Sequence, residues 1–175
     1  WFPMQADWQT TKLTDFASQH KDLWLVETVE ESGEHNLVVE QWLSQQYHKV
    51  AQEWVDDVRL ARFVTIPSPA LKPVDVQFGH QIRLTGFSVN QAERYFTITL
   101  RWESSRAIDV PYKLFIHLLD ATGAIIAQND QYPAGGFAPP TAWQPQVAVE
   151  DKHGLILPSA ETAGYSIQIG WYLPE

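Results

Sequence analysis

A strict alternation of apolar and polar residues in the middle of the chain sets the strongest limit on the fold. From Phe96 to Trp102 the order is Phe-Thr-Ile-Thr-Leu-Arg-Trp, without a break. Because successive side chains of a β-strand point to opposite faces, this pattern predicts a strand with one face in the core and one in water. Alternation also runs from Tyr112 to Leu118 and from Tyr165 to Trp171. Such strands, with little helical pattern between them, predict an antiparallel β-sandwich over 74–175, of jelly-roll or immunoglobulin-like type.

Glycine and turn-forming residues mark the breaks between these strands. Between Ile82 and Phe87 the alternation slips by one residue at Gly86, which predicts a β-bulge. The segment from Asp120 to Gly123 joins two apolar runs and predicts a hairpin. The stretch 129–145 is rich in Pro, Gly and Ala, and we expect it to form the one long loop.

The first 66 residues follow a different pattern, in which helical and strand periodicity alternate. We expect a small α/β subdomain over 1–66 and a proline-rich linker over 67–73, because proline interrupts helices and central strands alike. The whole chain is therefore expected to be mainly β, of α+β type. The elements expected in the subdomain are helices that start near Thr10 or Thr11 and near Ser32, a strand buried on both faces over Leu23–Val26, and strands over 49–54 and 58–65 joined by a turn at Asp56–Asp57.

Composition removes several classes of function. The net charge of −9, with only 12 Lys and Arg residues, argues against a nucleic-acid partner, since binding to phosphates requires clustered cations. The chain has no cysteine, which excludes disulfides, thiol nucleophiles and Cys-based zinc sites. No apolar run approaches the roughly 18 residues of a membrane span. The sequence starts at Trp1 without an initiator Met or a signal-peptide pattern, so we expect a fragment of a longer protein.

Titratable residues offer no complete active site. His117, with Asp120 shortly after it, could act as a general base or metal ligand, but a lone polar residue on the wet face of a strand is commoner. The Asp151-Lys152-His153 triplet has ligand-type side chains but no third partner in sequence. We therefore predict no catalytic residue, no metal site and no cofactor.

Acidic and glycine-rich segments also have simpler interpretations. Glu27, Glu30, Glu31 and Glu34 could bind a cation, yet they lack the pattern of a calcium loop and are better explained as solvated charge. Asp56 and Asp57 fall in a predicted tight turn, where Asp is favoured by turn geometry rather than by acid–base chemistry. The Gly135-Gly136 pair is not followed by the helix that a phosphate-binding loop needs.

Aromatic residues on the long loop are the candidates for ligand binding. Exposed rings of Tyr132, Phe137 and Trp143 could stack on a sugar. Alternatively, the rings fold back and close an open end of the sandwich, burying the large area that aromatic side chains usually bury. We favour the second interpretation and keep these residues as candidate carbohydrate-binding residues.

Several motifs follow one another along the chain in a recognisable order. They are Leu23–Val26, Val39–Leu43, Trp54, Val58–Phe63, Phe78–Phe87, Leu100–Trp102, Phe115–Asp120, Ala127–Asp130, Pro133–Gly136 and Pro140–Trp143. In these motifs the chain is similar, over nearly its full length, to the C-terminal extracytoplasmic region of bacterial polytopic membrane proteins of the dolichyl-phosphate-mannose-protein mannosyltransferase type. This resemblance implies a multi-span membrane domain before the fragment and a lipid-phosphate-linked sugar as donor. The acidic catalytic residues of that family have no counterpart here.

From the resemblance and the lack of an active site we expect a non-catalytic accessory region of a membrane-embedded glycosyltransferase-like protein. It would lie on the extracytoplasmic side of a bacterial membrane and contact its own membrane domain. One alternative is a carbohydrate-binding module that presents a glycan or acceptor. Another is a structural docking domain, which a large exposed apolar patch would favour.

Overall fold

Two β-sheets and two α-helices form most of the described part of the chain, residues 10–28, 37–158 and 164–174 of a computed structural model. The fold is mainly β, of α+β type, as the sequence predicts. The elements are α1 (Thr10–Ser18), β1 (Asp22–Thr28), α2 (Leu37–Gln46), β2 (His48–Val55), β3 (Val58–Val64), β4 (Lys72–Phe78), β5 (Ile82–Ala92), β6 (Tyr95–Ser104), β7 (Lys113–Leu119), β8 (Ile125–Gln131), the 3₁₀ turns η1 (Ala134–Gly136) and η2 (Pro140–Ala142), β9 (Val149–Ile156) and β10 (Ser166–Tyr172).

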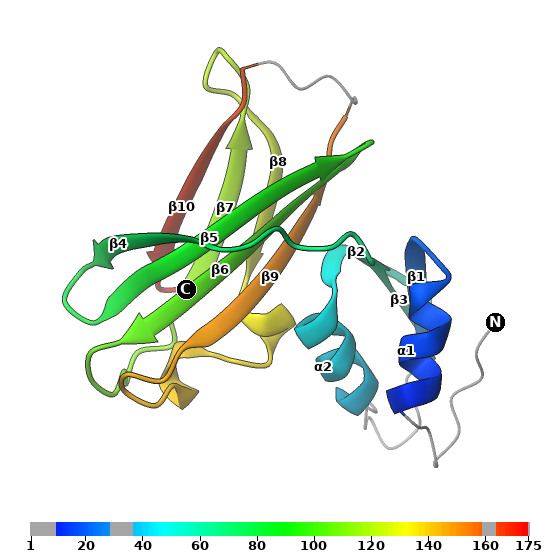
Figure 1. Cartoon of the computed structure of the whole chain (residues 1–175), viewed down its shortest axis with the longest axis horizontal. Helices are drawn as coiled ribbons and strands as arrows, with labels where there is room; N and C mark the ends of the chain where they lie inside the picture. The colour runs from blue at the N-terminus through cyan, green and yellow to red at the C-terminus, as the bar shows by residue number, and fades with distance from the viewer. Residues whose placement is uncertain (1–9, 29–36, 159–163, 175) are drawn as a thin grey trace.

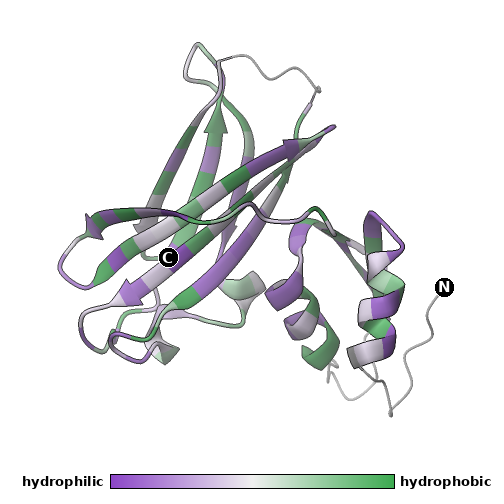
Figure 2. Ribbon diagram, in the orientation of Figure 1, coloured by the Kyte–Doolittle hydropathy of each residue, from purple (hydrophilic) through white to green (hydrophobic). Residues whose placement is uncertain are grey.

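The two sheets pack face to face. The larger has seven strands in the order β1-β3-β2-β9-β6-β5-β4, and the smaller has three in the order β10-β7-β8. Figure 1 shows the small sheet as a second layer behind β5, β6 and β9. The core between the layers contains Leu100 and Trp102 of the large sheet and Leu114, Ile116 and Leu118 of the small one. Apolar and polar residues alternate along these strands (Figure 2), which confirms the predicted antiparallel sandwich.

The strands from the first 66 residues belong to the same large sheet. Strand β2 pairs with β9 in parallel, through Lys49 opposite His153, while the strands on either side of this junction pair antiparallel. Helices α1 and α2 cover one face of β1 and β3, with Leu13, Leu43 and Phe63 in a second apolar cluster. The start of α2 expected near Ser32 lies outside the described residues.

Two strands differ from prediction in their burial. Strand β1 is not buried on both faces, because Trp24 is 52% exposed while Leu23 and Leu25 pack under the helices. The first half of strand β6 has no wet face, since Thr97 and Thr99 are buried as well, whereas Arg101 further along the same face is exposed. The hydroxyl of Thr99 lies 2.7 Å from that of Ser68 and 3.1 Å from Nε2 of His48, so the linker and β2 cover this face.

The predicted turns are confirmed, with small changes at the strand ends. The register between β5 and β6 shifts at Gly86, as expected for a bulge. A turn at Asp56–Asp57 joins β2 to β3, and the segment from Asp120 to Gly123 joins β7 to β8. The long loop starts only at Tyr132, because residues 129–131 complete β8. Strand β4 includes Pro73, which the edge position of this strand tolerates.

Candidate functional site

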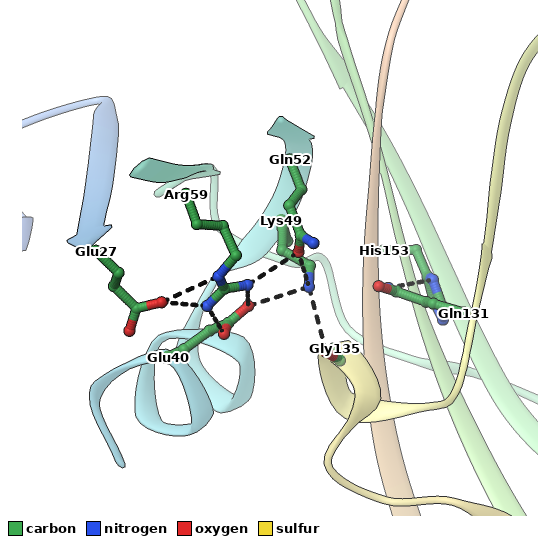
Figure 3. A network of polar contacts seen from close by, with 8 residues as sticks. All are labelled: Glu27, Glu40, Lys49, Gln52, Arg59, Gln131, Gly135 and His153. Carbon is green, nitrogen blue, oxygen red and sulfur yellow. Dashed lines mark hydrogen bonds and ion pairs between the residues drawn. The ribbon is translucent and has the colours of Figure 1, made fainter. Parts of the chain in front are cut away.

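A buried cluster of charged side chains lies where α2 meets the large sheet (Figure 3). The guanidinium of Arg59 donates to the carboxylates of Glu27 and Glu40. Nζ of Lys49 donates to Oε1 of Glu40 at 3.2 Å and to Oε1 of Gln52 at 3.3 Å. Glu40, Lys49 and Arg59 are all buried, so each charge depends on its partners rather than on water.

The electrostatics of the cluster hold Glu40 in its charged form. Burial by itself raises the pKa of this carboxyl, but hydrogen bonds and charges from Arg59 and Lys49 outweigh burial and hold the pKa below its usual value of 4.5. The pKa of Arg59 is raised, chiefly by its hydrogen bond to Glu40. Two cations therefore neutralise two carboxylates, which is a structural arrangement.

Lys49 also ties this cluster to the loop of the sandwich. Its Nζ donates to the carbonyl of Gly135 at 3.2 Å, in the first 3₁₀ turn of the loop (Figure 3). A side chain at Gly135 would overlap the Ser44 side chain of α2, and the φ of Gly135 is +70°. Glycine at this position therefore lets the loop lie directly against the helix.

A second polar group, formed by Asp151 and His153, lies inside the sandwich. Both residues are 0% exposed, and Nε2 of His153 lies 2.6 Å from Oδ2 of Asp151. Asp151 also accepts from the indole of Trp102 at 3.3 Å and from the backbone N–H of Ala134 at 2.8 Å. Nδ1 of His153 faces Asn129 Oδ1 at 3.1 Å. The pair joins the two sheets and holds the start of the loop, out of reach of any substrate.

Lys152, between these two residues, points to the opposite face. Its Nζ donates to the carbonyls of Gln45 and Gln46, at 2.7 and 3.4 Å. These are the last residues of α2, where free carbonyls and the helix dipole favour a cation. All three residues of the triplet therefore have structural contacts.

An open polar cleft of about 530 Å³ lies beside Lys49. Its walls come from β2, from β8 and from the loop after β8, so both halves of the chain contribute. Tyr132 lies in this cleft, and Nζ of Lys113 lies 5.8 Å from the centre of the tyrosine ring. The other side chains here are mostly amides and charges: Lys49, Gln52, Gln128, Asn129, Asp130 and Gln131. The amides among these groups can donate to and accept from hydroxyls, and Asp130 can accept from them.

The three aromatic candidates of the loop do not form one surface. Trp143 is 6% exposed; its ring packs edge-on against Trp171, and its Nε1 donates to the carbonyl of Ala138 at 2.9 Å. Phe137 is half-buried. Among the described residues, no ring contact joins Tyr132, Phe137 and Trp143 to one another. Of the three, Tyr132 lines an open cleft.

The remaining candidates have structural partners. His117 lies opposite the buried Ile116 and Leu118, as predicted, with Nε2 at 3.5 Å from Asp130 Oδ1. Asp120 accepts from Thr122 and Ala124 within its turn, and the hydrogen bond from Thr122 lowers its pKa. Glu27 binds Arg59, whereas Glu30, Glu31 and Glu34 lie outside the described residues. Within the described ranges, no group of three or more His, Asp or Glu side chains is placed to hold a metal ion.

Sequence reasoning missed the charged cluster. Glu40 belongs to a helix whose neighbouring Val39 and Leu43 are buried, and a carboxylate in such a position requires a cation. That signal was local, but nothing local showed that Arg59 and Lys49 supply the charges.

In the described part of the chain, no helix has the length and apolar character needed to span a membrane. The chain shows no significant match to any protein-family model, curated protein or solved structure.

Proposed function

We propose that the chain is a non-catalytic extracytoplasmic accessory region of a membrane-embedded glycosyltransferase-like protein. The membrane context rests on the family resemblance of the sequence. The non-catalytic role is supported by one observation: the short pair of His153 with Asp151 is buried inside the sandwich. A general acid or base must reach the substrate, and Asp151 and His153 are 0% exposed.

The test is a search for turnover by the purified chain. We expect no product with a lipid-phosphate-linked sugar and an acceptor peptide, or with nitrophenyl glycosides. Asp151→Asn serves as the control, because any activity that this substitution removes would come from the chain itself and would overturn the proposal.

An exposed apolar sheet face supports contact with the rest of such a protein. The register of β1, β3 and β2 places Trp24, Val26 and Val55 on the face opposite the helices, and these side chains are 52%, 45% and 51% exposed. Arg62 lies on the same face, with its guanidinium 5.3 Å from the Trp24 ring. Apolar surface of this kind commonly marks an interface.

Hydrogen exchange tests this contact. Strand β1 should exchange more slowly in the full-length protein in detergent or nanodiscs than in the isolated chain, while edge strand β4 should exchange equally in both. Equal exchange of β1 in the two samples would remove the contact from the proposal.

A carbohydrate-binding role is the second candidate, favoured by Tyr132 in its polar cleft. A half-buried ring in an open cleft, with amides and charges around it, is suited to a sugar, whose C–H face packs on the ring while its hydroxyls bond to the rim. Tyr132→Ala should weaken glycan binding, measured by isothermal titration calorimetry. Unchanged binding in this variant would exclude the cleft at Tyr132 as a glycan-binding site.

A further inference from the structure

A second cleft, of about 470 Å³, shares no lining residue with the cleft at Tyr132. It lies between the turn after β4 and the connection from β6 to β7, with Trp171 of β10 in its wall. Its volume falls in the range of about 300–1,000 Å³ that is typical of small-molecule sites. The side chains that matter here are Phe78, His80, Arg106, Asp109, Tyr112 and Trp171.

Trp171 lines this cleft, and two buried tryptophan rings pack against it. Trp102 and Trp143 pack edge-on against Trp171, with ring centroids 4.9 and 5.7 Å apart. The indole nitrogens of Trp102 and Trp143 donate to Asp151 and to the carbonyl of Ala138. The buried Nε1 of Trp171 has no hydrogen-bond partner among the described residues. This N–H is closed off from solvent, so Trp171 meets the cleft through the rest of its ring rather than through its donor.

The polar wall of the cleft is held in place before any ligand binds. Gln81, with its amide oxygen turned toward Arg106, accepts from Nη2 at 3.1 Å and from Nε at 2.9 Å. The backbone N–H of Ser105 donates to the carbonyl of Gln81 at 2.9 Å, and its hydroxyl donates to the carbonyl of His80 at 3.2 Å. The two connections that form the cleft are therefore tied together, which reduces the ordering cost of binding.

The mixture of groups selects a class of ligand. Arg106 offers donors and Asp109 offers acceptors, so the rim suits a molecule that has both, such as a polyhydroxylated ring. An anion would be attracted by Arg106 but repelled by the carboxylate of Asp109. The rings of Tyr112 and Trp171 supply apolar area for the C–H face of a sugar.

We propose that this cleft is a binding site for a neutral saccharide, with Arg106 and Asp109 bonding its hydroxyls and Tyr112 and Trp171 packing against its ring. The proposal extends the carbohydrate-binding candidate to a second place on the molecule and does not depend on the cleft at Tyr132.

Indole signals in a ¹H–¹⁵N correlation spectrum of the whole chain test the proposal. The probes are the methyl glycosides of glucose, mannose, galactose and N-acetylglucosamine, with glucuronate as the anionic comparison. We expect the Trp171 indole signal, assigned with Trp171→Phe, to shift saturably with at least one neutral glycoside. The indoles of Trp102 and Trp143 should shift less, because neither ring lines the cleft.

Variants separate this cleft from the other one. Asp109→Ala and Tyr112→Ala should weaken binding by about tenfold or more, equal to 1.4 kcal/mol, with unchanged dispersion of the indole signals as the control for folding. Tyr132→Ala should leave unchanged the affinity read from the Trp171 signal, because Tyr132 lines the other cleft. A Trp171 signal that does not move with any neutral glycoside, or that responds to glucuronate alone, would overturn the proposal. The proposal would also be overturned if Tyr132→Ala removed binding while Asp109→Ala and Tyr112→Ala left it unchanged.

Discussion

The sandwich and the helix-bearing part of the chain share one sheet but are stabilised in different ways. The sandwich has a continuous apolar core rich in aromatic rings, beside which lies the buried polar pair of Asp151 and His153. The smaller part has a small apolar cluster under α1 and α2 and, beside it, the ion pairs of Glu40, Arg59 and Lys49. The difference teaches that where apolar burial is limited, paired charges fill the interior, and stability there depends on every partner being present.

Removal of the Trp102 ring from the core of the sandwich should have the largest effect on the free energy of unfolding. Trp102 is 0% exposed and packs edge-on against Phe78 and Trp171. Trp102→Ala should lower the free energy of unfolding by about 3–5 kcal/mol, measured by urea denaturation. Val89→Ala, at an exposed position of the neighbouring strand, is the control. A small loss in the Trp102 variant would contradict the account of the core.

Disruption of the charged cluster should have the next-largest effect on the free energy of unfolding. Arg59→Met leaves Glu27 and Glu40 without their main partner, and the loss should be about 3 kcal/mol, because a buried charge then lacks compensation. The double variant Arg59→Met with Glu40→Met should lose less than the sum of the single variants. Arg83→Met, which breaks the more exposed pair with Glu103, should have a much smaller effect. Additive losses in the double variant would show that the cluster does not act as a unit.

One added carbon atom should be enough to strain the junction between the two parts. A Cβ at Gly154 would overlap Cγ1 of Val50 and lie 3.0 Å from the backbone oxygen of Lys49. Gly154→Ala should therefore push β9 and β2 apart and cost about 2 kcal/mol in unfolding experiments. Gly86→Ala is the matched control, since its Cβ would meet nothing closer than 3.6 Å. Equal losses at the two glycines would argue against close packing at the junction.

The buried His48 at the same junction should make the protein less stable in acid. Burial, followed by the charges of Lys152 and His153, lowers the pKa of His48 from 6.5 to about 3. The unfolded chain therefore takes up the proton first, so the contribution of His48 to stability is complete above pH 6.5 and is lost as the pH falls toward 3. The loss should be about 1 kcal/mol between pH 7 and pH 5.5. His48→Gln should flatten this slope, whereas substitution of the exposed His80 should not.

The local features of the fold could be predicted because a few neighbouring residues cause them. The alternation from Phe96 to Trp102, the slip at Gly86 and the turn at Asp120 are properties of short segments. The burial of Thr99 could not be predicted in this way, since Ser68 and His48, which cover it, come from distant parts of the chain.

The candidate site was harder to predict for the same reason. Tyr132 was named as a candidate, but its cleft also needs β2, which lies far away in sequence. Trp143 belongs to the same loop and yet is buried against Trp171, a contact that no spacing indicates. The apolar run around Trp24 indicated a strand, but its exposed face depends on which neighbours cover it.

Native-state hydrogen exchange of Glu40→Gln at pH 7 tests the difference between the two parts most directly. The substitution leaves the buried Arg59 and Lys49 with an excess of positive charge while the shape of the side chain is kept. We predict that amide protection falls in α2, β1 and β3 and is retained in β5, β6 and β7. An equal loss of protection across both parts, or no loss in α2, would contradict the claim that the charged cluster stabilises one part and the apolar core the other.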